Sequence, residues 1–262
     1  MRKIFYLALF FSLISFAKGE VPPLTYQVTV ENDLRSFAVS ACFSGNLPAF
    51  LYANDAFGSF VRNVRLDTGD MLELDVDSVA IPQDNAARCI FYDVFLQPRN
   101  QGEQRGGAET RLIEDRNMLT SIGDWLVRPK PDAFYESFEI GFSVPEDIFV
   151  STPWRRTGKT SFIGANTPIS WEGIVALTNR EPNVIDVAGS MFEVSILGDF
   201  GRTNQEDLVR WVTRSAQGVS GLMGFFPSPH VQVVVSPSDR GNAVVPWAYV
   251  TRGGGAGIHL FV

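Results

Sequence analysis

Eight short segments rich in valine, isoleucine, phenylalanine and tyrosine lie within residues 24–199, and they restrict the fold more than any other feature of the chain. Most of them alternate in part between apolar and polar residues, and clusters of glycine, proline, asparagine and aspartate separate them. Short segments at this spacing are typical of strands in an antiparallel β-sandwich. We therefore predict a mainly β protein with a β-sandwich domain over residues 20–199. The segments are LTYQVTVEN, SFAVSACFSG, FVRNVRLDTG, MLELDVDSV, ARCIFYDVFLQP, YESFEIGFSVP, SWEGIVALTN and SMFEVSILGD.

The pattern changes after Asp199, where a helical period replaces the alternation. Thr203 and Glu206 fit a capping box at a helix start, and Pro227 ends the helical stretch. The run HVQVVVSP is typical of a strand that is covered on both faces, and WAYVTR and IHLFV predict two further strands. These features predict a small α/β segment over residues 200–262. The apolar positions at helical spacing, which predict a buried face, are Leu208, Val209, Val212, Ala216, Val219 and Met223.

The first 19 residues have the three parts of a secretory signal peptide. Arg2 and Lys3 are followed by the apolar run Ile4–Phe16, and Ala17–Gly19 supplies small residues for cleavage. The run is shorter than the roughly 20 residues of a spanning helix. We therefore expect an exported protein, periplasmic or secreted, with no membrane span after cleavage.

Charge and cysteine content add two expectations. The formal net charge is -7 and no basic patch stands out, so we expect no nucleic acid as a partner. Cys42 and Cys89 both lie in strand-like segments of a chain that we expect to be exported. A disulfide across the sandwich and two separately buried cysteines remain open alternatives.

Motifs for metal or nucleophilic catalysis are absent from the sequence. It contains no HExxH, CxxC, GxSxG or phosphate-binding GxxxxGK[ST], and its only histidines are His230 and His259. His230 follows a proline, which favours a turn or surface position. His259 alternates with Ile258 and Leu260, so we expect it on the other face of its strand, towards substrate or solvent. We assign no catalytic residue and no metal ligand, and we expect no cofactor in this chain.

Three consecutive glycines, Gly253, Gly254 and Gly255, precede the last strand-like segment. Without side chains they allow another backbone to approach closely. One interpretation is a strand edge that receives an extended peptide or a partner chain. The other is a flexible loop between two strands.

Four stretches of the sequence, taken in their order along the chain, carry a resemblance to a known family. The stretches are SIGDWLVRP (Ser121–Pro129), SVPEDIFVSTPW (Ser143–Trp154), GFFPSPHVQVVVSPS (Gly224–Ser238) and VPWAYVTRGGGAGIHLFV (Val245–Val262). They resemble the glycyl-aminopeptidase-type family of zinc metallopeptidases, which belongs to the gluzincin group. The resemblance implies an N-terminal β-sandwich followed by the start of a thermolysin-like catalytic domain, in which one sheet edge binds the substrate backbone.

Only the peptide-binding edge of this family can be transferred to the present sequence. The resemblance places it on Arg252, the three glycines at 253–255 and His259. The two zinc histidines, the catalytic glutamate and the further glutamate ligand have no counterparts, so zinc is expected only with a downstream catalytic segment. We expect the substrate-binding N-terminal portion of a metallopeptidase-like protein, inactive alone. The alternative is a free-standing periplasmic module that binds peptides or proteins.

Overall fold

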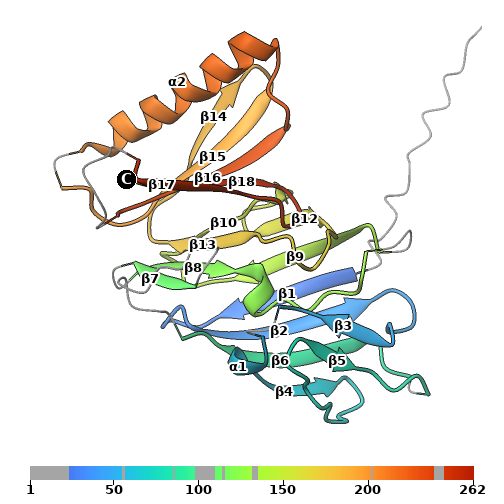
Figure 1. Cartoon of the computed structure of the whole chain (residues 1–262). Coiled ribbons are helices and arrows are strands. Elements are labelled where there is room, and N and C mark those ends of the chain that lie inside the picture. Colours follow the sequence, from blue (N-terminus) through green and yellow to red (C-terminus); the bar gives the residue numbers. More distant parts are fainter. Residues whose placement is uncertain are drawn as a thin grey trace, which may run out of the picture.

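The computed structural model describes residues 24–54, 57–84, 86–97, 110–113, 116–131, 135–201, 203–238 and 245–262. The signal peptide predicted at residues 1–19 lies outside these ranges. The described residues form a two-sheet sandwich, a third sheet and one long helix, which lies at the top of Figure 1. The prediction of a mainly β protein is confirmed.

The first sheet of the sandwich contains seven of the described strands. Its neighbours are antiparallel with one exception, because β1 and β9 run parallel with Tyr26 beside Ile140. Residues of β1 alternate strictly between buried and exposed, as the sequence pattern predicts for a sheet with one face in the core. In spatial order the strands are β11 (Arg155–Arg156), β12 (Ser161–Ala165), β9 (Ser137–Ser143), β1 (Leu24–Val30), β2 (Ser36–Phe43), β6 (Cys89–Phe95) and β4 (Val61–Leu66).

The second sheet lies between the first and the third and is covered on both faces. Every residue of β8 and β13 is buried. Met118 of β8 belongs to the core shared with the first sheet, whereas its neighbour Leu119 belongs to the core shared with the third sheet. The sheet therefore joins the sandwich to the rest of the molecule. Its antiparallel strands, in spatial order, are β10 (Phe149–Ser151), β13 (Ile174–Thr178), β8 (Asn117–Ser121) and β7 (Arg111–Ile113).

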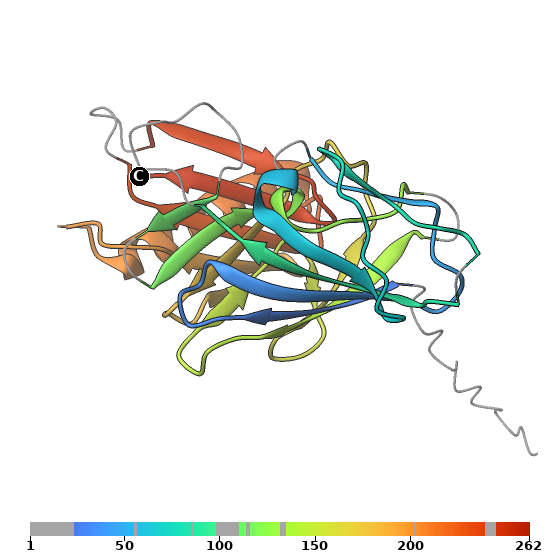
Figure 2. The same ribbon diagram turned by 90° about the horizontal axis from the view of Figure 1, so that it is seen from below.

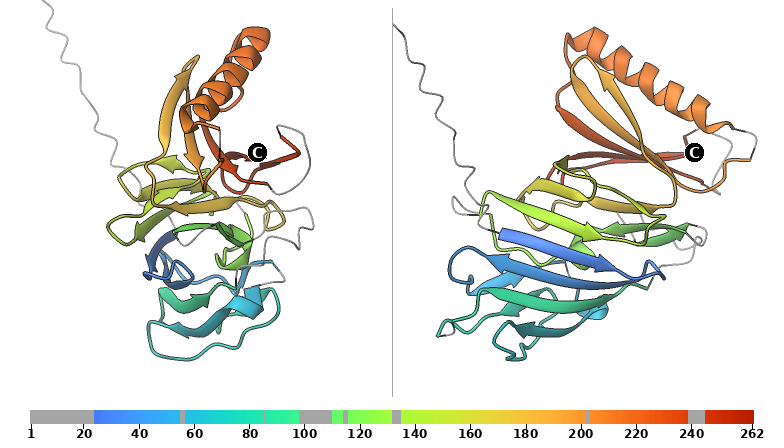
Figure 3. Two further views of the ribbon diagram at one scale, coloured as in Figure 1. Left: turned by 90° about the vertical axis from the view of Figure 1, so that its left-hand side faces the viewer. Right: turned by 180° about the vertical axis from the view of Figure 1, so that it is seen from behind.

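The third sheet has a parallel centre and an antiparallel hairpin at each edge. β15, β16 and β18 are parallel neighbours, and β16 is buried along its length after His230, as its sequence predicts. The side views show the long helix α2 (Gln205–Met223) lying across the outer face of this sheet (Figure 3), and from below the sandwich lies in front of it (Figure 2). In spatial order the strands are β14 (Asn183–Val187), β15 (Ser190–Ile196), β16 (His230–Ser236), β18 (Ala256–Phe261) and β17 (Trp247–Thr251).

The third sheet includes two strands that lie before residue 199, where the sequence predicts the end of the sandwich domain. β14 and β15 belong to this sheet, which therefore begins at Asn183, inside the range predicted for the sandwich. The two strands alternate like sandwich strands because their hairpin is also antiparallel, and alternation alone does not say which sheet a hairpin joins. The predicted terminal strand is present as β18 and lies inside the sheet, between β16 and β17.

The N-cap of helix α2 (Gln205–Met223) is Asn204, one residue later than the predicted cap Thr203. The side chain of Asn204, not that of Thr203, accepts a hydrogen bond from the backbone N–H of Glu206, at 3.1 Å. Gly224 ends the helix with φ of 79°, a conformation that favours glycine. Leu208, Val212 and Ala216 are buried as predicted, whereas Val219 and Met223 are 41% and 50% exposed. None of the helices in the described ranges is long and apolar enough to cross a membrane.

Shorter elements complete the sandwich. Cys42 and Cys89 form a disulfide between directly opposite positions of β2 and β6, so the bond joins neighbouring strands of one sheet and does not cross the sandwich. The predicted strand MLELDVDSV is mostly irregular and contributes residues only to β5 and to isolated bridges at Met71 and Leu74. The remaining elements are β3 (Phe50–Tyr52), β5 (Ser78–Ala80), α1 (Phe57–Phe60) and the short helix η1 (Ile122–Asp124).

Candidate functional site

The three glycines form the turn between β17 and β18 and lie against the sandwich. The N–H of Gly253 donates to Glu172 O at 2.7 Å, and its carbonyl accepts from Trp154 Nε1 at 2.9 Å. A Cβ at Gly255 would lie 1.8 Å from Pro153 O. The close backbone approach predicted from these glycines is therefore present, but the neighbouring backbone belongs to the same chain.

Backbone groups of Arg252 and Gly254 have hydrogen-bond partners within the chain as well. The N–H of Arg252 donates to Glu172 O at 2.9 Å, and the carbonyl of Gly254 accepts from Ala165 N at 3.0 Å. These groups join the third sheet to the sandwich. The role of Arg252, Gly253, Gly254 and Gly255 in binding a substrate backbone stays a prediction.

His259 is buried between the third sheet and the sandwich, with 1% of its surface exposed. Its Nε2 lies 2.7 Å from Ser236 Oγ and its Nδ1 lies 2.8 Å from the Tyr249 hydroxyl. Burial, with a smaller contribution from the cation of Arg111, lowers its pKa to about 3. The expected position towards solvent is wrong, because the second sheet covers this face. The role of His259 in binding a substrate backbone stays a prediction. Ser236 is also fully buried, so this Ser-His pair bridges β16 and β18 inside the core.

The open edge of the third sheet on this side is β17, not the terminal strand. No strand of the described ranges pairs with the outer side of β17. Trp247 and Val250 are 54% and 66% exposed. An unpaired edge of this kind presents backbone N–H and C=O groups to which an extended peptide can hydrogen-bond.

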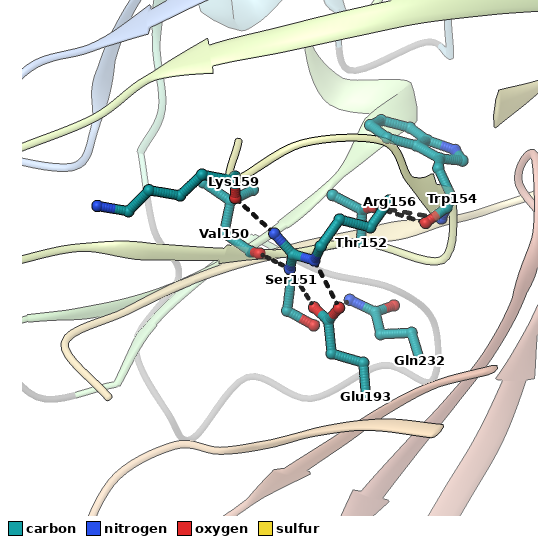
Figure 4. Close-up of polar contacts among 8 residues, drawn as sticks. All are labelled: Val150, Ser151, Thr152, Trp154, Arg156, Lys159, Glu193 and Gln232. Carbon is teal, nitrogen blue, oxygen red and sulfur yellow. Dashed lines mark hydrogen bonds and ion pairs between the residues drawn. The ribbon is translucent and has the colours of Figure 1, made fainter. Parts of the chain in front are cut away.

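A buried ion pair joins the sandwich to the third sheet on the opposite side (Figure 4). Arg156 of β11 binds Glu193 of β15 with both ends of its guanidinium, Nε to Oε2 at 3.0 Å and Nη2 to Oε1 at 2.7 Å. The Glu193 side chain is 4% exposed. Arg156 also donates to the carbonyls of Val150 and Lys159, at 2.8 and 2.6 Å, and lies over the ring of Phe162. These contacts hold its side chain in one position.

Two further polar contacts lie beside the ion pair, one from β16 and one after β10. Gln232 donates to Ser151 Oγ at 3.3 Å, and Thr152 Oγ1 accepts from the N–H of Trp154 at 3.2 Å. Gln232 and Ser151 are fully buried. The sequence offers one signal for this cluster, because Glu193 interrupts the apolar run of β15 and a charge inside a buried strand needs a partner. The identity of Arg156 as that partner, 37 residues away, has no local signal.

A cavity of about 230 Å³ lies beside the ion pair, where edge strands of all three large sheets approach one another. Its lining is mainly apolar apart from the ion pair and the charged residues of its rim. Sites for drug-sized ligands occupy roughly 300–1,000 Å³. The volume is therefore closer to the size of one large side chain. The lining includes Phe149 and Val150 of β10, Arg156 of β11, Val184 of β14, and Glu181 and Pro182 before β14.

A second cavity of about 230 Å³ separates α2 from β18 on the outer face of the third sheet. Trp211 and Val219 form its helical wall, and Ile258 and Leu260 form its floor. Leu222 near the helix end is 89% exposed. This apolar groove has no cover among the residues that the structure describes.

Metal-ligating side chains do not gather in the described part of the chain. No group of three or more histidine, cysteine, aspartate or glutamate residues there is arranged to hold a metal ion.

Solved structures share this fold. No protein-family model matches the sequence, and no curated protein matches it significantly. An aminopeptidase N family protein from Idiomarina loihiensis matches with a TM-score of 0.66 and 9% identity, over 91% of this chain and 42% of that chain. Aminopeptidase A of Legionella pneumophila, in complex with aspartic acid, matches with a TM-score of 0.51 and 9% identity, over 92% of this chain and 30% of that one. The present chain thus has an aminopeptidase-like fold and spans less than half the length of either protein.

Proposed function

We propose that this chain provides the β-sandwich and the first part of a peptidase-like domain in a metallopeptidase-related protein, where it binds the backbone of an extended peptide. The observation that carries the proposal is the unpaired edge of β17 in a fold that matches an aminopeptidase N family protein over 91% of the chain. Edge strands bind peptides by main-chain hydrogen bonds, which suits a protein that must accept varied sequences.

Hydrolysis is assigned to groups outside this sequence. A catalytic zinc site uses three protein ligands and an open position for water. Of the two histidines, His259 has both ring nitrogens within hydrogen-bond distance of Ser236 and Tyr249. His230 has no second histidine near it in a HExxH pattern. The chain by itself is therefore expected to bind peptides without cleaving them.

Export from the cytoplasm forms part of the proposal. The sequence of residues 1–19 supports it, and so does the Cys42–Cys89 disulfide, because such bonds persist mainly in oxidising compartments. Mass spectrometry of the protein recovered from its native host tests it. An N-terminus near Glu20 in a periplasmic or secreted fraction is the expected result, and an intact Met1 in the cytosol contradicts it.

The test of peptide binding uses Trp247, which is exposed on the β17 edge. Titration with a blocked extended peptide should change the fluorescence of Trp247 and shift the backbone amide signals of β17. In the Trp247→Phe variant the fluorescence change should disappear while the amide shifts remain. Saturating peptide without any change in β17 contradicts the proposal.

A free-standing binding module is the second candidate. The contacts that favour it are those that fix the third sheet to the sandwich, Trp154 to Gly253 and Arg156 to Glu193. A module requires the purified chain to be monodisperse and to melt in one cooperative transition. Separate melting of the two units, or aggregation through exposed edges, favours a portion of a larger protein.

A further inference from the structure

The hairpin of β14 and β15 fixes which backbone groups of β14 take part in the sheet. Its two-residue turn, Ala188 and Gly189, has φ values of 54° and 80°, as in a type I′ turn. Val187 and Ser190 flank this turn and face each other. In such a hairpin this pair is hydrogen-bonded, and hydrogen-bonded and non-hydrogen-bonded pairs then alternate along the strands.

The alternation directs the N–H and C=O groups of Val184 and Asp186 away from β15. The opposite strand supports this assignment, because Met191, which faces Asp186, donates its N–H to Pro229 O at 2.9 Å on the β16 side. No described strand pairs with the outer side of β14. The outer edge of β14 therefore presents two donors and two acceptors to a guest chain.

The cavity lies on the face of β14 to which Val184 points. Val184 faces Glu193 across the hairpin, and Glu193 binds Arg156 of the sandwich. Side chains of opposite residues share a face, so Val184 and Asp186 point towards the sandwich. Val184 is 60% exposed and lines the cavity of about 230 Å³. A guest residue opposite Val184 would direct its side chain into the same cavity.

The charges around this edge favour a cationic guest residue. Glu181 and Asp186 are exposed acids, and Lys159 is the one exposed base of the cavity lining within the described ranges. One oxygen of Asp186 accepts from Gly189 N at 3.1 Å, and its second oxygen is available to a guest. Opposite charges at facing positions of an antiparallel pair stabilise the pair.

We propose that the cleft between β10, β11 and β14 binds an extended protein segment as an added antiparallel strand on β14, with one apolar side chain in the cavity and a basic residue two positions before it, facing Asp186. The spacing follows from the strand period of two, because the residues facing Asp186 and Val184 lie on one face of the guest. The order follows from the antiparallel direction. The site is at the opposite edge of the third sheet from β17, so its test is independent of the test of the proposed function.

A short blocked peptide serves as the probe. Acetyl-Ser-Lys-Thr-Leu-Thr-Ser-amide places lysine opposite Asp186 and leucine opposite Val184. Nuclear magnetic resonance of the isotopically labelled chain should show shifts of the Val184 and Asp186 amides that saturate with peptide. Replacing leucine by serine should weaken binding about tenfold or more, because the apolar contact is lost. Replacing lysine by glutamate should weaken it about two- to fivefold. An N-methyl group on the leucine should abolish it, because that N–H is the donor to Val184 O.

Two protein variants test the same contacts from the other side. Asp186→Lys should reverse the charge preference, so that the glutamate probe binds more tightly than the lysine probe. Val184→Pro should abolish binding, because it removes an outward N–H while leaving the hydrogen bonds to β15 in place. Val76→Ser, at a position of the sandwich that is 61% exposed and outside both sheet edges, is the matched control and should change nothing. Thermal melts of each variant confirm that it is folded.

Three results would overturn the proposal. The first is saturating shifts that map to β17 and spare β14. The second is equal binding of the N-methylated and unmodified probes. The third is concentration-dependent shifts of β14 without any probe, which would identify a second copy of the chain as the occupant.

Discussion

Removal of the Arg156 guanidinium is the perturbation whose consequence can be worked out most fully. In Arg156→Met the carboxylate of Glu193, with its side chain 4% exposed, loses both of its charge-assisted hydrogen bonds. Breaking a buried pair in this way costs about 3–5 kcal/mol. Because the Arg156 side chain is itself 32% exposed, water can reach the vacated position, so we expect the lower end, about 3 kcal/mol. For a protein of this size that lowers the melting temperature by about 6–12 °C.

Urea denaturation at neutral pH measures this loss, and a double-mutant cycle isolates the ion pair. Glu193→Leu alone should also destabilise the chain, because it leaves the Arg156 side chain without its carboxylate. The double variant Arg156→Met/Glu193→Leu should be more stable than the sum of the single effects predicts, since neither charge is left unpaired. A loss below about 0.5 kcal/mol in Arg156→Met, or strict additivity of the two changes, would show that the ion pair does not stabilise the fold.

Three further predictions concern His259, the disulfide and Gly255. His259 has a pKa of about 3 in the folded chain and 6.5 in the unfolded chain, so the unfolded state binds more protons below pH 6.5. The free energy of unfolding should therefore fall by about 1.4 kcal/mol per pH unit from pH 6.5 towards pH 3. Urea denaturation curves at a series of pH values should show this slope, and the His259→Gln variant should lack it. Reduction of the Cys42–Cys89 disulfide, which spans 47 residues, should cost about 4 kcal/mol, measured by melting with and without reductant and with Cys42→Ser as a control. Gly255→Ala should cost about 3 kcal/mol or more, because its Cβ would meet Pro153 O at 1.8 Å; a melting temperature equal to that of the unmodified chain would show that this contact is relaxed.

Alternating and continuous apolar patterns predicted much of this fold. β1 and β2 alternate in the sequence because one face of their sheet lies in the core, and β16 is a continuous apolar run because both of its faces are covered. β8 was missed for a related reason. Its sequence, NMLTS, is fully buried between two sheets, yet it includes an asparagine, a threonine and a serine, so neither alternation nor an apolar run marks it.

The candidate sites depend on contacts that no local pattern encodes. The glycines at 253–255 predicted a close backbone approach, and it is present, but the sequence could not show that Pro153 and Glu172 are the partners. His259 alternates correctly with its apolar neighbours. Its face is nevertheless buried, because the second sheet, which supplies the cover, is distant in sequence. The sequence therefore identified the residues of interest but not the distant segments that contact them.

One experiment measures peptide binding and peptide hydrolysis by this chain together. The purified chain is incubated with zinc and a leucine-containing peptide while the β17 amide signals and the peptide mass are followed together. We expect saturable shifts of the β17 amides and an uncleaved peptide after prolonged incubation. Cleavage that a chelator abolishes would contradict this expectation.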